Sequence, residues 1–388
     1  MTVLLATSPG SGDERVHGGD MSGRTISARA LVLAAALALL AQILVSLPSL
    51  LGEADVLVRH FDGPNYLVVA KTLYRPTEKS PMPGYIFSPH YFAAHLPLYP
   101  LTVRAIAPVA GYPVGLLLAT ALFGVASAVV FARYLGVAAP EVPVLFGTLL
   151  FLCVPARHLL YRSIGATEAP MAFCVVLAAL AYRTDRIGLA FAAASLASVT
   201  RINGVLVIGV LAAALLARRR VRSAIVGSAL ACVPLVATFA WQGRVLGSSF
   251  AFFETHAGKK NFAPFGWLLE KAGEGQWVEA ELLLAVFLFY GVAALRLWET
   301  GDRLEAGLVA AHLGLFALLR ETDLPRYFLS VAPFAVVIAF RDVWKRPSLA
   351  LAFLAVASPV ALAYAWRSMP NNICHPETYA VLLRFLKS

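Results

Sequence analysis

Apolar runs separated by shorter polar segments dominate the chain. They lie at 30–51, 113–133, 142–155, 168–183, 187–200, 202–217, 223–242, 279–297, 304–319, 327–340 and 348–366. A helix that crosses a bilayer needs roughly 20 apolar residues, and about half of the runs come close to that length. We divide 187–217 at Arg201, because a single helix would hold this arginine near mid-membrane at high cost. The pattern predicts an all-α polytopic membrane protein with about eleven transmembrane helices.

The segment 91–110 is apolar but is interrupted by Pro97, Pro100 and Pro108. Proline inside a helix removes a hydrogen bond and bends the chain, so we predict a surface-lying or re-entrant element rather than a span. The Gly63-Pro64 turn predicts the start of another helix, because proline favours the first helical turn. We therefore expect amphipathic juxtamembrane helices in a large first outer loop.

The distribution of basic residues predicts which side each loop occupies. Nearly half of the 32 Lys and Arg residues lie in or beside the short segments 1–29, 134–141, 184–186, 218–222, 298–303 and 341–347. Short cytoplasmic loops carry an excess of Lys and Arg. We thus expect a disordered cytoplasmic N-terminal tail at 1–29, a transmembrane domain at 30–366 with outer loops at 52–112 and 243–278, and a short outer C-terminal tail at 367–388.

Composition agrees with this membrane interpretation. The chain is 59% hydrophobic and 14% charged, whereas a soluble domain carries about a quarter charged residues. The net charge of +10 comes from scattered loop residues, without the basic stripe of a nucleic-acid-binding surface. The four cysteines show no metal-ligand spacing or disulfide framework. No phosphate-loop, dinucleotide-binding, serine-hydrolase or zinc-protease motif is present.

Ionisable and polar residues from several distant segments fall on the predicted outer side. The candidates are His60, Asp62, Arg162, Glu168, Arg201, Asn203, Arg326 and Tyr327. Such groups at membrane depth tend to mark function. Arginines near helix ends suit a phosphate, since the guanidinium offers paired donors. Snorkelling to lipid headgroups is the alternative explanation for each of them.

Asp62 is the sharpest single candidate. It is followed by Gly63, which would let a substrate approach the backbone closely, and its neighbours in sequence are apolar. Partial desolvation is expected to raise the pKa of Asp62 and to make it a better general base. The alternative is that Asp62 simply caps the following helix.

Six short segments then show a family resemblance. In chain order they are FDGPNYLVVAKTLY (61–74), HYFAAHLPLYPL (90–101), ATEAPMAFCVVLA (166–178), VTRINGVLVIG (199–209), LGSSFAFFETHAGKKNFAP (246–264) and PRYFLSVAPF (325–334). They resemble segments of the GT-C integral membrane glycosyltransferases, most of all the PIG-V (GPI mannosyltransferase II) group and its bacterial relatives. Three positions depart from that pattern: His95 replaces an aromatic residue, Ser248 an aspartate and Lys260 an arginine.

The resemblance implies an inverting hexosyltransferase that moves a sugar, typically mannose, from a polyprenyl-phosphate donor to a lipid, glycan or protein acceptor. The reaction would take place on the non-cytoplasmic face, at the plasma membrane in a bacterium. Asp62 would be the general base, Arg162, Arg201 or Arg326 would stabilise the departing phosphate, and Glu168 and Asn203 would hold sugar hydroxyls. Asp55 and Asp62 are a weak candidate pair for a divalent metal, and we expect no metal or other cofactor.

Three other function classes remain open on sequence grounds. A transporter or flippase of a lipid-linked or small polar substrate would show inverted repeats and broken helices. A membrane acyltransferase would need a nucleophile and base deep in the bundle, for which His312 is the available residue. A catalytically inactive scaffold of the same family is the third, and the intact segment around Asp62 speaks against it.

Overall fold

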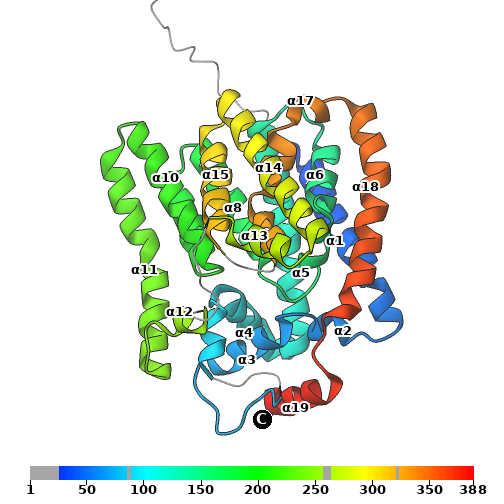
Figure 1. The fold of residues 1–388 in the computed structure, drawn as a ribbon, viewed down its shortest axis with the longest axis vertical. Coiled ribbons are helices and arrows are strands. Elements are labelled where there is room, and N and C mark those ends of the chain that lie inside the picture. Colours follow the sequence, from blue (N-terminus) through cyan, green and yellow to red (C-terminus); the bar gives the residue numbers. More distant parts are fainter. Residues whose placement is uncertain (1–25, 85–88, 257–263, 320–322) are drawn as a thin grey trace, which may run out of the picture.

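The computed structural model describes residues 26–84, 89–256, 264–319 and 323–388, which form a helical bundle (Figure 1). The predicted N-terminal tail at 1–29 lies almost entirely outside these residues. Within them no β-strand occurs, apart from an isolated bridge between His60 and Ile373. The prediction of an all-α fold is therefore confirmed.

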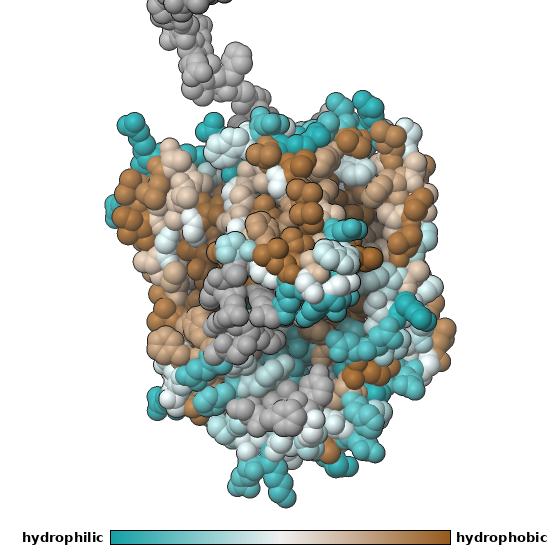
Figure 2. All heavy atoms as spheres, in the orientation of Figure 1, coloured by the Kyte–Doolittle hydropathy of each residue, from teal (hydrophilic) through white to brown (hydrophobic). Residues whose placement is uncertain are grey.

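Five helices of the described chain are long and apolar enough to cross a membrane. They are α1 (Ala28–Leu51), α5 (Tyr112–Ala138), α11 (Val221–Leu246), α14 (Trp277–Glu299) and α18 (Pro347–Ser368). Apolar side chains cover the flanks of the molecule, whereas polar side chains gather towards its two ends (Figure 2). This distribution is that of a protein whose flanks face lipid, so the chain is a membrane protein.

The other predicted spans coincide with shorter helices. These are α6 (Val144–Cys153), α8 (Glu168–Arg183), α9 (Ile187–Ser198), α10 (Val205–Ala217) and α15 (Arg303–Leu318). The ten residues of α6 rise only about 15 Å, half of the bilayer core, so the count of eleven crossings stays a prediction. The division of 187–217 is confirmed, since the 3₁₀ turn η2 (Ile202–Gly204) separates α9 from α10.

The run at 327–340 does not form a regular α-helix. A short helix, α16 (Leu324–Tyr327), is followed by the 3₁₀ turn η4 (Phe328–Ser330) and the π-helical segment η5 (Pro333–Ile338). Residues 328–339 are all buried. Irregular backbone at membrane depth is tolerated only where protein surrounds it, and this segment satisfies that condition. α17 (Arg341–Trp344) then leads into α18.

The predicted first outer loop is largely helical. It contains α2 (Val56–Arg59), α3 (Gly63–Thr72), the 3₁₀ segment η1 (Pro89–Ala94) and α4 (Leu98–Ala110). These elements gather with α12 (Ala251–His256) at one end of the bundle (Figure 1). The connections α7 (Ala156–Tyr161) and α13 (Gly266–Gly273) complete the described helices of the loops.

The C-terminal segment is more structured than a simple tail. After the turn η6 (Met369–Asn371), it forms α19 (Pro376–Lys387), which packs against α3 and buries Tyr379 and Leu382. Apolar residues recur on one side of this short helix, and that spacing explains why it lies along the protein instead of extending away.

The close packing at Gly204 allows a stability test of the α9–α10 break. A Cβ atom at this position would lie 2.2 Å from the carbonyl carbon of Ala197. We expect Gly204→Ala to lower the free energy of unfolding by about 1–3 kcal/mol, because the clash is with backbone and cannot be relieved by a rotamer change. The matched control is Gly209→Ala in α10, where a Cβ would meet nothing within 4 Å. Thermal unfolding of both variants in detergent checks this, and equal midpoints would contradict it.

Candidate functional site

A cavity of about 400 Å³ opens at the end of the bundle that carries α3 and α12. Its polar lining includes Asp62, His95, Arg201, Asn203, Asp323 and Arg326, and its aromatic lining includes Phe61, Tyr66, Tyr91, Phe252, Phe316 and Tyr327. The cavity is within the size range of small-molecule sites. Segments far apart in the chain build it, so the predicted convergence of polar residues is found for five of the eight candidates.

Asp62 lies at the start of α3, and its side chain is 25% exposed. It makes no capping hydrogen bond to that helix, so the simple cap interpretation does not account for it. One carboxylate oxygen, Oδ1, lies 3.7 Å from His95 Nε2, and the other, Oδ2, lies 3.8 Å from Arg326 Nη1. The Asn65 amide also donates to Oδ1 over 3.4 Å. The carboxylate is therefore held between two cationic or donor groups at the cavity wall.

The backbone around Asp62 is constrained on both sides. Phe61 has φ of 52°, a left-handed conformation that costs a non-glycine residue roughly 1–2 kcal/mol. A Cβ at Gly63 would lie 2.5 Å from the carbonyl oxygen of Val58. Gly63 is thus needed for packing against its own chain, and the expectation that it also serves substrate approach stays a prediction.

Glu168 connects the two arginines of the cavity. Its Oε1 accepts a 2.6 Å hydrogen bond from Arg201 Nη1 and a hydrogen bond from Arg326 Nε. Glu168 itself does not line the cavity, and the expectation that it holds sugar hydroxyls stays a prediction. It lies behind the arginines and fixes their positions, because a carboxylate can accept from more than one guanidinium.

Aromatic rings also hold the guanidinium groups. Arg326 lies over Phe61 and Tyr161, with 4.0 and 4.4 Å from its Cζ to the ring centroids. Arg201 lies 4.7 Å over Tyr327. Stacking of this kind stabilises a cation by about 0.5–2 kcal/mol. A guanidinium has five N–H donors, and the contacts to Glu168 use only a few of them, so further donors remain for an anionic ligand.

Several buried polar atoms at the site lack partners among the residues that the structure describes. They include His95 Nδ1, Asn203 Nδ2 and Glu168 Oε2. Buried polar groups are nearly always hydrogen-bonded, so each of these atoms has unused capacity. Asn203 lines the cavity directly, and its free amide donor suits a ligand hydroxyl or another oxygen acceptor.

His60 and Arg162 do not line the cavity, and their assignment as substrate-binding residues stays a prediction. His60 Nδ1 lies 2.6 Å from the carbonyl oxygen of Met369. Arg162 Nη2 donates to the carbonyl oxygen of Gly124 over 2.6 Å, and burial lowers the pKa of Arg162 to about 10. The sequence predicts that both residues lie on the outer side together with Asp62. In the structure, the local backbone directs both side chains into the protein interior.

Several cavity residues were missing from the sequence-based site, among them His95, Tyr66 and Asp323. His95 was visible only as a departure from the family pattern, and Tyr66 only as part of the resembling segment 61–74. Asp323 pairs with Arg157 and lies 4.0 Å from Arg326 Nη1. Its role depends on these tertiary neighbours, which no local pattern reveals.

The pKa of Asp62 is lower than its usual value, contrary to the expected increase. Burial by itself would raise it, but the hydrogen bond and charge of His95 and the charges of Arg326 and Arg201 outweigh burial. Opposite charges within several ångströms favour the ionised carboxylate. Asp62 is therefore a carboxylate at neutral pH.

Comparisons of the chain with protein-family models, with curated proteins and with solved structures found no match.

Proposed function

We propose that this protein is an inverting glycosyltransferase that moves a hexose, most simply mannose, from a polyprenyl-phosphate donor to a hydroxyl group of a lipid, glycan or protein. The observation that carries the proposal is the cavity in which an ionised carboxylate, Asp62, lies beside two arginines held by Glu168. A base and a pair of anion-binding cations are the groups that such a transfer needs.

The proposed step assigns a role to each group. Asp62 removes the proton of the acceptor hydroxyl, whose oxygen forms the new bond to the anomeric carbon. The bond from that carbon to the phosphate oxygen breaks, and its electron pair leaves with the phosphate. Arg201 and Arg326 stabilise the resulting anion, since charge-assisted hydrogen bonds from guanidinium groups to phosphate are strong and directional. Phosphate is a good leaving group, so a general acid is not required.

The remaining lining of the cavity suits a sugar. Asn203 offers an unpartnered amide donor, and Tyr66 and Tyr327 present aromatic surface. Apolar and aromatic walls with a few placed polar groups are typical of small-molecule sites. In this proposal the donor phosphate faces the arginines, while the sugar lies between Asn203 and Asp62.

We further propose the topology of eleven crossings with a cytoplasmic N-terminus. The segment 91–110, seen as η1 and α4, would then lie at the outer surface with α3. The excess of Lys and Arg in the opposite loops supports this orientation. It puts the cavity on the non-cytoplasmic face, where a lipid-linked sugar is within reach.

The test is direct transfer by purified protein. The protein in detergent or proteoliposomes is supplied with polyprenyl-phosphate mannose, radiolabelled in the sugar, together with a membrane lipid extract, and labelled products are separated by chromatography. We expect a labelled glycolipid to form with the unmodified chain. Absence of transfer from this donor and from other polyprenyl-phosphate sugars would reject the proposal and favour a transporter.

His95 predicts a change in the pH dependence of that transfer. In His95→Phe, Asp62 loses a donor that stabilises its ionised form, so its pKa rises. Because the carboxylate is the active form, the acid limb of the rate profile is expected to move to higher pH. His95→Gln retains a hydrogen-bond donor and should move the limb less. Initial rates measured across the acid range check this, and identical limbs in all three proteins would contradict it.

A further inference from the structure

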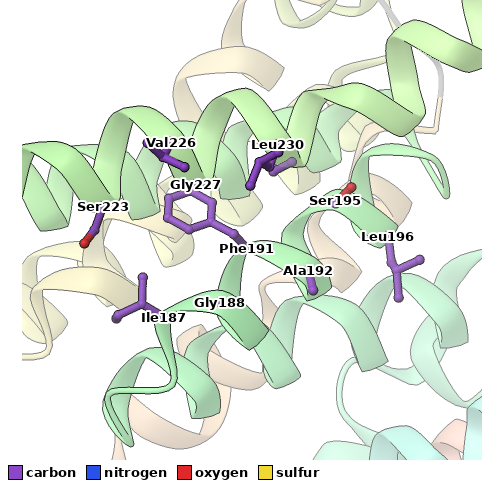
Figure 3. Close-up of a pocket in the computed structure, with 11 residues that line it drawn as sticks. Ile187, Gly188, Phe191, Ala192, Ser195, Leu196, Ser223, Val226, Gly227 and Leu230 are labelled. Atoms are coloured by element: carbon purple, nitrogen blue, oxygen red, sulfur yellow. The ribbon is translucent and has the colours of Figure 1, made fainter.

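A second cavity lies on the flank of the bundle, and its lining is chemically unlike that of the candidate site. It is a groove of about 660 Å³ between α9 and α11 (Figure 3). Its walls are apolar, with Leu196 on α9 and Val226 and Leu230 on α11, and its polar lining is limited to two serines. Leu230 is 66% exposed. Such a surface is unfavourable in water, so an apolar molecule or lipid has to cover it.

The floor of the groove is formed by a close helix contact. The ring of Phe191 lies against Gly227, where a Cβ atom would be 2.2 Å from the ring (Figure 3). Ala192 adds only a methyl group to the wall. Because small residues line the space beside this contact, the two helices touch at the floor and leave a channel open above it.

The length of the groove fits one acyl chain. From Ile187 to Leu196 a helix rises about 14 Å, close to half the thickness of the hydrocarbon core. The groove begins where α9 and α11 begin, at the end of the bundle opposite α3 and α12 (Figure 1). It therefore spans a single leaflet, as a phospholipid tail does.

The charge at the open end of the groove identifies the headgroup. Arg186 and Arg222 immediately precede the lining residues Ile187 and Ser223, and both arginines are exposed. Neither forms a side-chain hydrogen bond or ion pair within the described part of the chain. The neighbouring Arg220, by contrast, pairs with Asp185. Two unpaired guanidinium groups at the leaflet surface attract anionic lipid.

We propose that the α9–α11 groove is a binding site for one anionic phospholipid, with an acyl chain along Phe191 and Leu230 and the headgroup phosphate between Arg186 and Arg222. The site does not depend on the proposed sugar transfer. Each arginine near a membrane surface contributes roughly a fivefold gain in affinity for anionic lipid. Together they would give about a 30-fold preference for an anionic over a zwitterionic headgroup.

Native mass spectrometry of the delipidated full chain, titrated with phosphatidylglycerol or phosphatidylcholine, tests the site. We expect one tightly bound phosphatidylglycerol and weaker phosphatidylcholine. The double variant Arg186→Gln/Arg222→Gln should lower the affinity for phosphatidylglycerol about 30-fold. The matched control is Arg346→Gln, an exposed arginine before α18, which should bind as the unmodified protein does.

A second pair of variants tests the channel itself. Ala192→Trp fills the groove and is expected to remove binding of both lipids, whereas Ala352→Trp, on the exposed face of α18, leaves binding unchanged. Equal affinity for the two headgroups would overturn the proposal, as would unchanged binding in Ala192→Trp. A dimer that dissociates in Ala192→Trp would instead assign the groove to a second copy of the chain.

Discussion

Replacing Asp62 with Asn is expected to reduce the initial rate of sugar transfer by a factor of about 10²–10⁴, the range that a positioned general base contributes. Asparagine has nearly the same shape as aspartate, but its amide cannot take up the proton of the acceptor hydroxyl. The attraction of Asp62 to His95, Arg326 and Arg201 lowers its pKa, so loss of its charge should also lower the free energy of unfolding. That loss should be smaller than for a fully buried ion pair, because the Asp62 side chain is 25% exposed. The thermal unfolding midpoint is therefore measured on the same preparation, and the rate should fall by much more than any loss of folded protein explains.

The matched control for this result is Asp55→Asn. Asp55 lies in the same loop, but its carboxylate Oδ2 is 3.0 Å from Arg59 Nη1 and it does not line the cavity. Transfer by Asp55→Asn should remain near the level of the unmodified chain. If Asp62→Asn retained full activity while the unmodified protein transferred sugar, Asp62 would not be the base, although the proposed reaction would stand.

Glu168→Gln is expected to produce the largest loss of stability, about 3–5 kcal/mol in the free energy of unfolding, the range for breaking a buried ion pair from one side. The side chains of Glu168 and Arg326 are 3% and 5% exposed. In this variant the Glu168 carboxylate no longer lies between the Arg326 and Arg201 guanidinium groups, and the two positive charges remain close together. Their repulsion should also displace both groups, so transfer falls together with stability.

Thermal unfolding in detergent and the transfer rate should be measured on the same preparation of this variant. Glu254→Gln serves as the control, because Glu254 is 50% exposed and accepts a hydrogen bond from Ser248. An exposed charge of this kind contributes less than about 1 kcal/mol. If Glu168→Gln unfolded at the temperature of Glu254→Gln, Glu168 would not organise the two arginines.

The bounds of the long helices could be predicted closely from the sequence. Whether a shorter apolar run forms a regular α-helix could not. The predicted 113–133 and 279–297 correspond to α5 and α14, because a long apolar run bounded by polar residues predicts a helix. The run at 327–340 has the same composition and forms short 3₁₀ and π segments. Residues 328–339 are buried on all sides, and irregular backbone is tolerated where protein surrounds it.

The sequence could predict that a residue belongs to the cavity only where its residue type is unusual for its position in the chain. Asp62, Arg201, Asn203, Arg326 and Tyr327 all line one cavity. The last four are polar or amphipathic residues at the end of an apolar run, and Asp62 lies in the first outer loop. A residue of this type at membrane depth is rare enough to attract notice in sequence alone. The turn directions that bury His60 and Arg162 elsewhere are set by contacts with distant segments.

The sequence by itself determined that the protein is helical and embedded in a membrane, because both follow from composition and from the spacing of apolar residues. It also singled out Asp62. Only the tertiary structure decided the electrostatic state of that carboxylate. Desolvation, the one influence visible in sequence, raises its pKa, whereas His95, Arg326 and Arg201 together lower it. These three residues come from separate segments, and charges act through distance in space, which the order of residues does not give.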